Sequence, residues 1–499
     1  MQAESQNGPE FALPLGLRYN LNVADAVPSS KNIQQFLSSN ASTFTGTSNN
    51  VCRIPIGSPA FLDLKNSLLQ FDFKNANGGA QTLQLDGGAD CVIRRVRVIS
   101  SDGSVIEELH QYGLLSSVLD QYTMGAGSQK VSKILKGAPG RNDETAAIAI
   151  KKSPVNGTPA AGAQTVKTYE TGLEVKITAA GAADVTSAIE LSSAGGIGYN
   201  QGDSDVLNQN VTRRYMFQLK LGMFNLATAK LLMPNTNFTL EIEFNDPANC
   251  TVISDDAAPT YEVRNVELHV PAIIINDASF MQRMNQRMNQ GVVMSCNSYS
   301  HFVNTTDGNT AGKDVSQISA RARSLKGLMS IFRKQPSTTN KELFSLSKRS
   351  IEYLTSYQYR IGSTNYPVDR IDIKTGGQTT GAGNLPLTAA AADINVADAY
   401  SHALRLTGNL NVQNAESLID VQSFANSEIN NGTGIAAIDL STYADNSVNS
   451  GIATLDNMPI SFEYEKNNFS GNVKLQIDTF AVQQMTIVRS PAGVLSSFM

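Results

Sequence analysis

Tryptophan is absent from this chain of 499 residues, and histidine and cysteine occur only four times each. The histidines show no HExxH or other metal-ligand spacing. The cysteines form no CxxC pair, so we expect free, mostly buried thiols in a reducing compartment rather than a disulfide framework. These absences remove the usual sequence evidence for a metalloenzyme or a disulfide-bonded secreted domain. The residues concerned are His110, His269, His301, His402, Cys52, Cys91, Cys250 and Cys296.

Charge is also scarce, since Asp, Glu, Lys and Arg make up only 17% of the chain and the net charge is −5. No basic stripe of the kind that marks a nucleic-acid binder is present, and we expect no sequence-specific nucleic-acid binding. The longest apolar run, Val270–Ile275, is much shorter than a bilayer span and suits a buried strand. The first residues lack the charged and apolar regions of a signal peptide, so we expect no secretory leader.

Strand periodicity is the main pattern that the chain does contain. Phe238–Phe244 reads FTLEIEF, with apolar residues at every second position, which predicts a half-buried strand. Tyr215–Phe224 and Ile351–Ile361 alternate in the same way. Helical spacing is found over Glu107–Tyr122 and in the tandem RMNQ segment Met281–Gln290, where three methionines share one face of a predicted helix. The excess of strands predicts an all-β fold.

Four segments of the first half are echoed in the same order in the second half. Lys65 and Lys326, within LKNSLLQFDFK and LKGLMSIFRK, lie 261 residues apart, and Glu241 and Glu463, within FTLEIEF and ISFEYEK, lie 222 apart. The shared order favours a duplicated β unit over chance likeness between hairpins. The other echoes pair RRVRVISSDGSVI with SYQYRIGSTNYPV, and VRNVELHVPAIII with VKLQIDTFAVQQMTIV.

The unequal offsets indicate that the two copies differ in their middle segments. The first copy carries extra chain at Gly125–Thr212, rich in Ala, Gly, Ser and Thr, which predicts a long loop insertion. The second copy has its own insertion at about Thr375–Asn457. Antiparallel units of about eight strands with one polar face are typical of jelly rolls. We therefore predict two consecutive eight-stranded antiparallel jelly rolls with long loop insertions and few short helices.

Two stretches resemble catalytic or phosphate-binding sequences without meeting their requirements. His110 follows Glu107 and Glu108, which suggests acid–base chemistry, but no nucleophile is placed beside them, and we interpret the three as a solvated helix face. Gly125–Gly137 begins GAGSQK like a phosphate loop but lacks the Gly-Lys-Ser/Thr ending, and we interpret it as the start of a flexible loop.

A pair of carboxylates, Asp369 and Asp372, is the remaining acidic candidate, and such pairs are common in loops near strand ends. A glycoside hydrolase needs two carboxylates flanking a cleft, and nothing in the spacing supports one. We therefore predict that the chain is not an enzyme and has no catalytic residue, metal ligand or cofactor-binding residue.

The N-terminal segment has an unusually long alternation. Every odd position from Phe11 to Val23 is apolar, while Pro14 and Gly16 disfavour a central strand. Such a segment is an aggregation hazard if it is left exposed. It either docks along a jelly roll, its own or a neighbour's, by strand addition, or forms an ordinary first strand.

Three stretches resemble segments of a known protein family. RVISSDGSVIEELHQYGLL (97–115), YQYRIGSTNYP (357–367) and MPNTNFTLEIEFNDP (233–247) are similar to hairpin and strand segments of double jelly-roll major capsid proteins of polinton-like viruses and virophages. As architecture, the resemblance covers most of Val51–Ser490. It implies homotrimers whose six jelly rolls form pseudo-hexagonal blocks, and an icosahedral shell of such blocks around a double-stranded DNA genome.

The duplication and the resemblance together divide the chain. We expect an extended arm over residues 1–50, the first jelly roll over 51–276, a helical linker over 277–290 and the second jelly roll over 291–499. The resemblance implies as partners the other copies of a homotrimer, neighbouring capsid trimers, a penton protein and minor capsid or cement proteins. It implies localisation in the virion, assembled inside the host cell.

Basic clusters fit this interpretation better than nucleic-acid recognition. Neighbouring strand residues such as Arg94 and Arg95 point to opposite faces, which works against one continuous phosphate track, whereas Arg321 and Arg323 share a face. We expect ion pairs between subunits, with contact to packaged DNA as a lesser use. The clusters are Arg94, Arg95 and Arg97; Arg213 and Arg214; Arg321, Arg323 and Lys326; and Arg333 and Lys334.

The alternative function is a β-sandwich binding module, such as a carbohydrate-binding spike or adhesin. Such modules often display surface aromatics for sugar stacking, but tryptophan is absent and the tyrosines fall mainly within predicted strands. Association state separates the two functions, because a capsid protein forms trimers and shells whereas a binding module does not need to.

Overall fold

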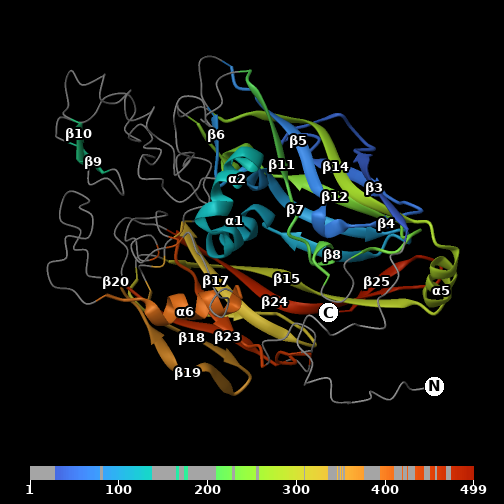
Figure 1. The fold of residues 1–499 in the computed structure, drawn as a ribbon. Helices are drawn as coiled ribbons and strands as arrows, with labels where there is room; N and C mark the ends of the chain where they lie inside the picture. Colours follow the sequence, from blue (N-terminus) through green and yellow to red (C-terminus); the bar gives the residue numbers. More distant parts are fainter. Residues whose placement is uncertain are drawn as a thin grey trace, which may run out of the picture.

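The structure is a computed structural model in which two β units lie one above the other (Figure 1). The alternating segment Phe11–Val23 and most of the two predicted insertions lie outside the described residues. The structure describes residues 28–78, 83–137, 164–167, 174–177, 210–226, 231–253, 258–307, 310–334, 346, 349, 351, 354–375, 394–408, 419, 424, 433–442, 450–455, 458–467 and 474–498.

The first unit consists of two antiparallel sheets, with strand orders β1-β14-β5-β11 and β3-β12-β7-β8. Apart from the hairpin β7–β8, neighbours in each sheet are distant in sequence, as in the jelly-roll topology. The strands are β1 (Ser29–Leu37), β3 (Val51–Ile56), β5 (Leu68–Asn75), β7 (Ile93–Ser100), β8 (Val105–His110), β11 (Thr212–Phe217), β12 (Phe238–Phe244) and β14 (Tyr261–Ile275). Shorter strands are β2 (Thr43–Phe44), β4 (Phe61–Leu62), β6 (Leu83–Leu85), β9 (Gln164–Lys167), β10 (Glu174–Ile177) and β13 (Thr251–Ile253).

The second unit repeats this arrangement, with strand orders β15-β24-β17-β22 and β16-β23-β18-β19. The strands are β15 (Val292–Asp307), β16 (Gly312–Ile318), β17 (Leu325–Lys334), β18 (Leu354–Ile361), β19 (Thr364–Asp372), β22 (Ala436–Asp439), β23 (Ile460–Lys466) and β24 (Lys474–Arg489). Shorter strands are β20 (Lys374–Thr375), β21 (Ile394–Asn395) and β25 (Leu495–Phe498), which pairs with β24.

All four sequence echoes fall on strands that occupy equivalent positions in the two units. The echoed hairpins turn at Gly103 (φ 88°) and Gly362 (φ 61°), where a left-handed backbone favours glycine. The equivalent pairs are β5 with β17, β7–β8 with β18–β19, β12 with β23, and β14 with β24. The prediction of an all-β fold with two consecutive eight-stranded jelly rolls is confirmed.

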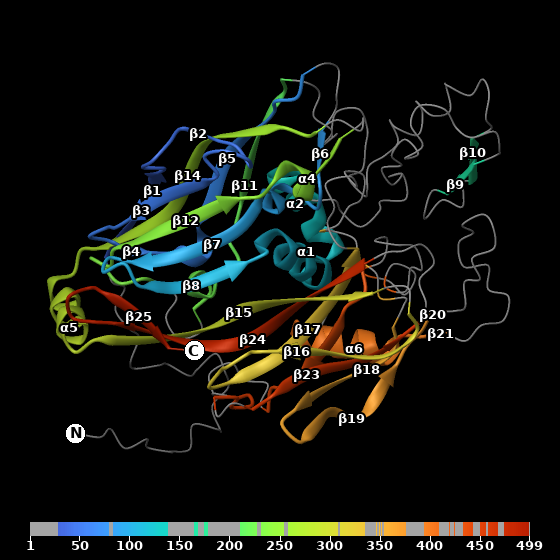
Figure 2. The ribbon, with the colours of Figure 1, turned by 180° about the vertical axis from the view of Figure 1, so that it is seen from behind.

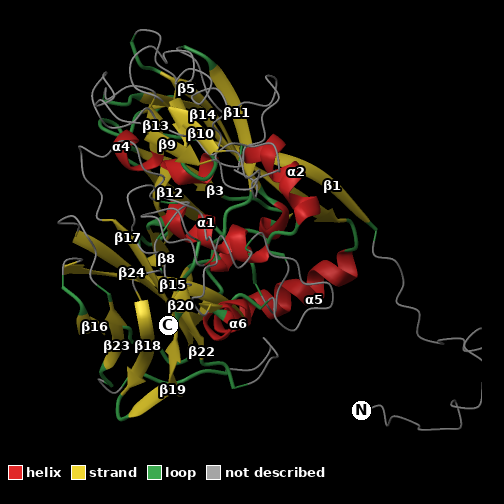
Figure 3. Cartoon of the chain, turned by 90° about the vertical axis from the view of Figure 1, so that its left-hand side faces the viewer, coloured by secondary structure: helices red, strands yellow, loops and turns green. Residues whose placement is uncertain are grey.

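The helices lie beside the sheets, as Figure 3 shows. Asp277 caps α5 by accepting hydrogen bonds from the first-turn N–H groups of Ser279 (2.8 Å) and Phe280 (3.1 Å). On α5, Met288 is buried and two other methionines are half-buried, as expected for one shared face. The helices are α1 (Tyr112–Thr123), α2 (Ala126–Lys136), α4 (Pro247–Cys250), α5 (Ala278–Asn289) and α6 (Ala397–Leu406).

The helix predicted over Glu107–Tyr122 was wrong in its first part. The chain is a strand as far as His110 and becomes helix α1 only at Tyr112. Gln111 between them adopts a left-handed conformation (φ 51°), which ends the strand and redirects the chain. The strand predicted over residues 215–224 ends at Phe217 and is followed by the 3-10 turn η5 at 222–224.

Two strands lie inside ranges that the sequence analysis assigned to an arm and to an insertion. β1 lies inside the range predicted as an arm, 1–50, but pairs with β14 along its whole length. Its sequence SSKNIQQFL is mostly polar because β1 is an edge strand that is largely exposed. β22 lies inside the second predicted insertion, 375–457, and pairs with β17. Its residues Ala436 to Ile438 are all buried, so they show no alternation that would mark a strand.

Candidate functional site

The two rolls meet along a junction in which β8 of the first lies beside β15 of the second (Figure 2). Glu107 on β8 is fully buried there, with 0% of its surface exposed. Its carboxylate accepts hydrogen bonds from the backbone N–H groups of Gly222 (2.8 Å) and Met223 (3.0 Å) and from Ser298 Oγ on β15 (2.8 Å). Burial raises the pKa of Glu107, and the three hydrogen bonds offset part of that rise.

The interpretation of Glu107 as part of a solvated helix face was therefore wrong. Successive residues of a strand point to opposite sides, so Glu107 enters the junction while Glu108 remains on the outer face. The backbones also approach closely at this point. A Cβ atom on Gly222 would lie 2.3 Å from the carbonyl oxygen of Asn297, so only glycine fits there.

Further hydrogen bonds join the rolls on either side of Glu107. Arg489 at the end of β24 donates to Thr236 Oγ1 (2.8 Å) and to the carbonyl oxygen of Pro234 (3.1 Å). The N–H of Leu495 donates to Ser100 Oγ (3.0 Å). Toward α1, the rolls are joined by Tyr122 Oη to the Thr433 carbonyl (3.2 Å) and by Leu346 N–H to Asp86 Oδ2 (2.7 Å). These contacts fix the two rolls as one block.

A second buried polar group holds the central strands of the second roll. Asp478 on β24 is fully buried and pairs with Arg333 on β17 (2.5 Å) and His301 on β15 (2.8 Å). Gln476 donates to the same carboxylate (2.9 Å). Burial opposes ionisation of Asp478, but the charge of Arg333 and the hydrogen bond from His301 outweigh it and hold the pKa of Asp478 at about 2.

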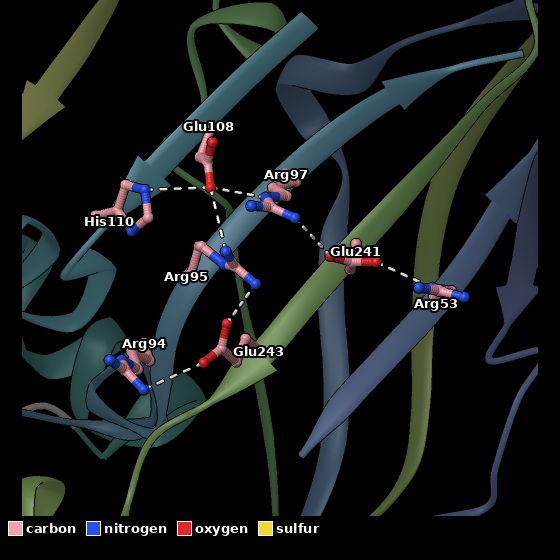
Figure 4. Close-up of polar contacts among 8 residues, drawn as sticks. All are labelled: Arg53, Arg94, Arg95, Arg97, Glu108, His110, Glu241 and Glu243. Carbon is pink, nitrogen blue, oxygen red and sulfur yellow. Dashed lines mark hydrogen bonds and ion pairs between the residues drawn. The ribbon is translucent and has the colours of Figure 1, made fainter. Parts of the chain in front are cut away.

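The outer face of the sheet β3-β12-β7-β8 carries a ladder of ion pairs (Figure 4). Burial tends to raise the pKa of Glu108, but its hydrogen bond with Arg97 and the neighbouring positive charges lower it overall. The contacts in this ladder are Arg53–Glu241 (2.9 Å), Arg97–Glu241 (3.5 Å), Arg97–Glu108 (2.7 Å), Arg95–Glu108 (3.3 Å), Arg95–Glu243 (2.6 Å), Arg94–Glu243 (3.3 Å) and His110–Glu108 (3.1 Å).

The prediction that Arg94 and Arg95 point to opposite faces was wrong. The pairing of β7 with β12 shifts register between Glu243 and Phe244, so Arg94 is an extra residue in a β-bulge. Both arginines therefore reach Glu243 (Figure 4). These ion pairs lie within one chain, and ion pairs of the 94–97 cluster between subunits remain a prediction.

We predict that Arg53→Gln changes the free energy of unfolding by less than about 1 kcal/mol, because exposed ion pairs contribute little. The Arg53 side chain is 59% exposed, whereas Arg95 is 21% exposed and bridges two carboxylates. Urea denaturation should therefore show a larger loss for Arg95→Gln than for Arg53→Gln. The reverse order would mean that the burial of an arginine in this ladder does not determine how much its ion pairs contribute to stability.

Sequence reasoning missed a buried cluster of two lysines and two aspartates in the first roll. Lys136 on α2 donates to Asp90 Oδ2 (3.0 Å) and pairs with Asp120, which also pairs with Lys220. Lys220 donates to the Ser116 carbonyl as well (2.8 Å). Burial disfavours the charge on Lys136, but the two carboxylates outweigh it and raise the pKa of Lys136. The lysines and aspartates are scattered along the sequence, and only the fold brings them together.

The interpretation of Gly125–Gly137 as a flexible loop start was wrong. The segment is helix α2, and its last residue Lys136 is anchored in the buried cluster. The stretch QKVSKILK at 129–136 contains no Gly, Pro or Asn, and this is the signal that could have indicated a helix.

The other candidate residues are placed apart from one another. Asp369 and Asp372 are exposed on β19, and Arg214 pairs with Asp72 within the chain (2.7 Å). The four cysteines are buried and free, as predicted. In the described part of the chain, no group of three or more His, Cys, Asp or Glu side chains could hold a metal ion. None of the helices described here is long and apolar enough to span a membrane.

Two jelly rolls in one chain, each with the same strand order and joined through a buried junction, define the double jelly-roll fold. No protein-family model and no curated protein matches the sequence.

Solved structures do match, with low sequence identity. A chain in the cryo-EM structure of the Sputnik virophage is 12% identical with a TM-score of 0.56, covering 100% of this chain and 93% of that chain. The Faustovirus major capsid protein is 9% identical with a TM-score of 0.54, covering 94% and 92%. The mavirus major capsid protein is 8% identical with a TM-score of 0.52, covering 100% and 96%. At these identities the similarity concerns the fold.

Proposed function

We propose that this chain is a viral major capsid protein, located in the virion and assembled inside the host cell. The observation that carries the proposal is the repetition of one strand order in two rolls that are held at a fixed position by buried hydrogen bonds. A doubled unit of this kind can build near-six-fold packing from three copies. The solved double jelly rolls from Faustovirus and mavirus bear the name major capsid protein, which supports the same function.

In this proposal three chains form a homotrimer whose six jelly rolls make a pseudo-hexagonal block, and blocks tile an icosahedral shell around double-stranded DNA. Neighbouring trimers, a penton protein and minor capsid or cement proteins are its partners. We also infer that residues 277–290 act as the linker between rolls and that the chain before β1 acts as an arm.

Light scattering on the soluble protein tests the trimer. Three chains of 53.5 kDa give about 160 kDa, consistent with closed cyclic symmetry. Negative-stain electron microscopy of the same sample should show hexagonal blocks. A stable monomer without such blocks would contradict the proposal and favour a binding module.

A further inference from the structure

The two rolls share one end, which we call the base, where α5 connects β14 to β15. α5 and β25 lie together at this end in Figures 1 and 2. In the first roll, β3 and β7 both finish opposite the start of β12, and β4 pairs with the last part of β14. In the second roll, β16 and β18 finish opposite the start of β23 in the same way. The contact between Leu495 and Ser100 makes the two ends continuous.

Five exposed arginines lie at the base. Two are one helical turn apart on α5, two lie in the segment between β16 and β17, and one lies at the end of β18. The guanidinium of Arg323 lies 5.8 Å from the ring centre of Phe498 on β25, which places the 319–324 segment beside that strand. These residues, which we call the base arginines, are Arg283, Arg287, Arg321, Arg323 and Arg360.

None of the base arginines forms an ion pair with a carboxylate of the described residues. Arginines on the sheet faces differ, because Arg53, Arg94, Arg214 and Arg264 are similarly exposed but each pairs with a glutamate or aspartate. The side chains of those four are 59%, 58%, 58% and 45% exposed. Exposure alone therefore does not explain why the base arginines are left without carboxylate partners.

Three carboxylates described at the base accept hydrogen bonds from nearby backbone N–H groups. Asp63 accepts hydrogen bonds from Asn66 N–H (3.3 Å), Asp102 from Ser104 N–H (3.0 Å), and Asp277 from the first turn of α5. Each carboxylate stabilises its own turn or helix start rather than neutralising an arginine at ion-pair distance. The base thus presents guanidinium groups to the solvent although the chain as a whole carries a net charge of −5.

We propose that the base arginines bind the phosphate backbone of duplex DNA without reading its sequence. The proposal rests on the proposed function, in which the shell encloses double-stranded DNA. Guanidinium groups form charge-assisted hydrogen bonds with phosphate oxygens, and duplex DNA offers a dense row of them. The base arginines lie on α5, in the 319–324 segment and on β18, so they do not belong to one helix or strand that could enter a groove and read nucleotide bases. The binding is therefore electrostatic and depends on salt.

The test compares two variants with the same loss of charge. The first carries Arg283→Gln, Arg287→Gln, Arg321→Gln and Arg323→Gln. The matched control carries Arg53→Gln, Arg94→Gln, Arg214→Gln and Arg264→Gln, which removes four exposed arginines that are paired within the chain. Fluorescence anisotropy with a labelled duplex of about 30 base pairs, over a range of NaCl concentrations, measures affinity and its salt slope.

We expect the base variant to lose at least about tenfold in affinity, and the slope of log K against log salt to become shallower by about 3–4. The control should keep the slope of the unaltered protein. Each single base substitution should lower the slope by about 1, which gives a second measurement if the fourfold variant folds poorly. Equal losses in base and control variants would overturn the proposal, because net charge alone would then explain binding.

Binding to vesicles that contain phosphatidylglycerol is measured as a separate experiment. Binding to vesicles that depends on the base arginines, without binding to DNA, would replace DNA by a lipid surface and overturn the proposal. Assembly is scored separately by electron microscopy. Trimers that form hexagonal blocks but keep full DNA affinity in the base variant would refute this inference and leave the capsid function standing. A monomer that binds DNA through the base would refute the capsid function alone.

Discussion

Replacing Asp478 by asparagine is expected to lower the free energy of unfolding by about 3–5 kcal/mol. The substitution keeps the size of the side chain but removes the charge that Arg333 and His301 both face. Arg333 is 3% exposed, so its guanidinium would remain buried without a counter-charge. Chemical denaturation followed by fluorescence or circular dichroism measures the loss.

The lowered pKa of Asp478 also predicts that the free energy of unfolding depends on pH. The pKa of Asp478 is lowered from 3.8 to about 2 by folding, so the folded state stabilises the charged form. This stabilisation, about 2.5 kcal/mol, is present above about pH 4 and is lost as the pH falls toward 2. The Asp478→Asn variant should lack this component of the acid-induced loss of stability.

Asp369→Asn is the matched control, because the same substitution falls on an exposed position of β19. Its effect should stay within about 0.5 kcal/mol. A small effect of Asp478→Asn, similar to that of the control, would mean that the buried group is not an ion pair in solution.

Replacing Glu107 by alanine is expected to cost at least about 3 kcal/mol. The N–H groups of Gly222 and Met223 and the hydroxyl of Ser298 would lose their acceptor in a junction that excludes water. Two of these donors belong to the first roll and one to the second, so the loss should also loosen the rolls from each other. Denaturation that becomes two separate transitions would be direct evidence of this loosening.

Two further variants test whether the stability loss of Glu107→Ala comes from the junction or from the removal of any carboxylate. Ser298→Ala removes one donor and keeps the carboxylate, so it should cost only about 1 kcal/mol. Glu262→Ala removes a partly exposed carboxylate that pairs with Arg264 and should cost less than about 1 kcal/mol. If Glu107→Ala were no more harmful than Glu262→Ala, the junction would not depend on this carboxylate.

Local departures from regular strands explain the predictions that were wrong. The helical spacing over Glu107–Tyr122 and the strand pattern around Arg94 could not reveal the left-handed turn at Gln111 or the bulge at Arg94, because each depends on a partner strand or on the start of a neighbouring element. The burial of β22 on consecutive residues removes the period-two pattern on which strand prediction relies.

The sequence by itself determined the architecture of this protein. Apolar and polar residues alternate along a half-buried strand because successive side chains face opposite sides of a sheet. Phe238–Phe244 and its echo in the second half both show this alternation. Four echoes in one order then predicted two jelly rolls, and the strand orders agree.

Only the tertiary structure decided which charges are buried and which are free. Asp90 forms an ion pair with Lys136, and Asp478 forms one with Arg333. Across the junction, Glu107 accepts a hydrogen bond from Ser298. The two residues of each pair are far apart in the sequence. The base arginines likewise differ from the paired arginines only in where the fold places them. A charge's environment depends on the groups that the fold brings within a few ångströms of it, and composition and spacing carry no record of those distances.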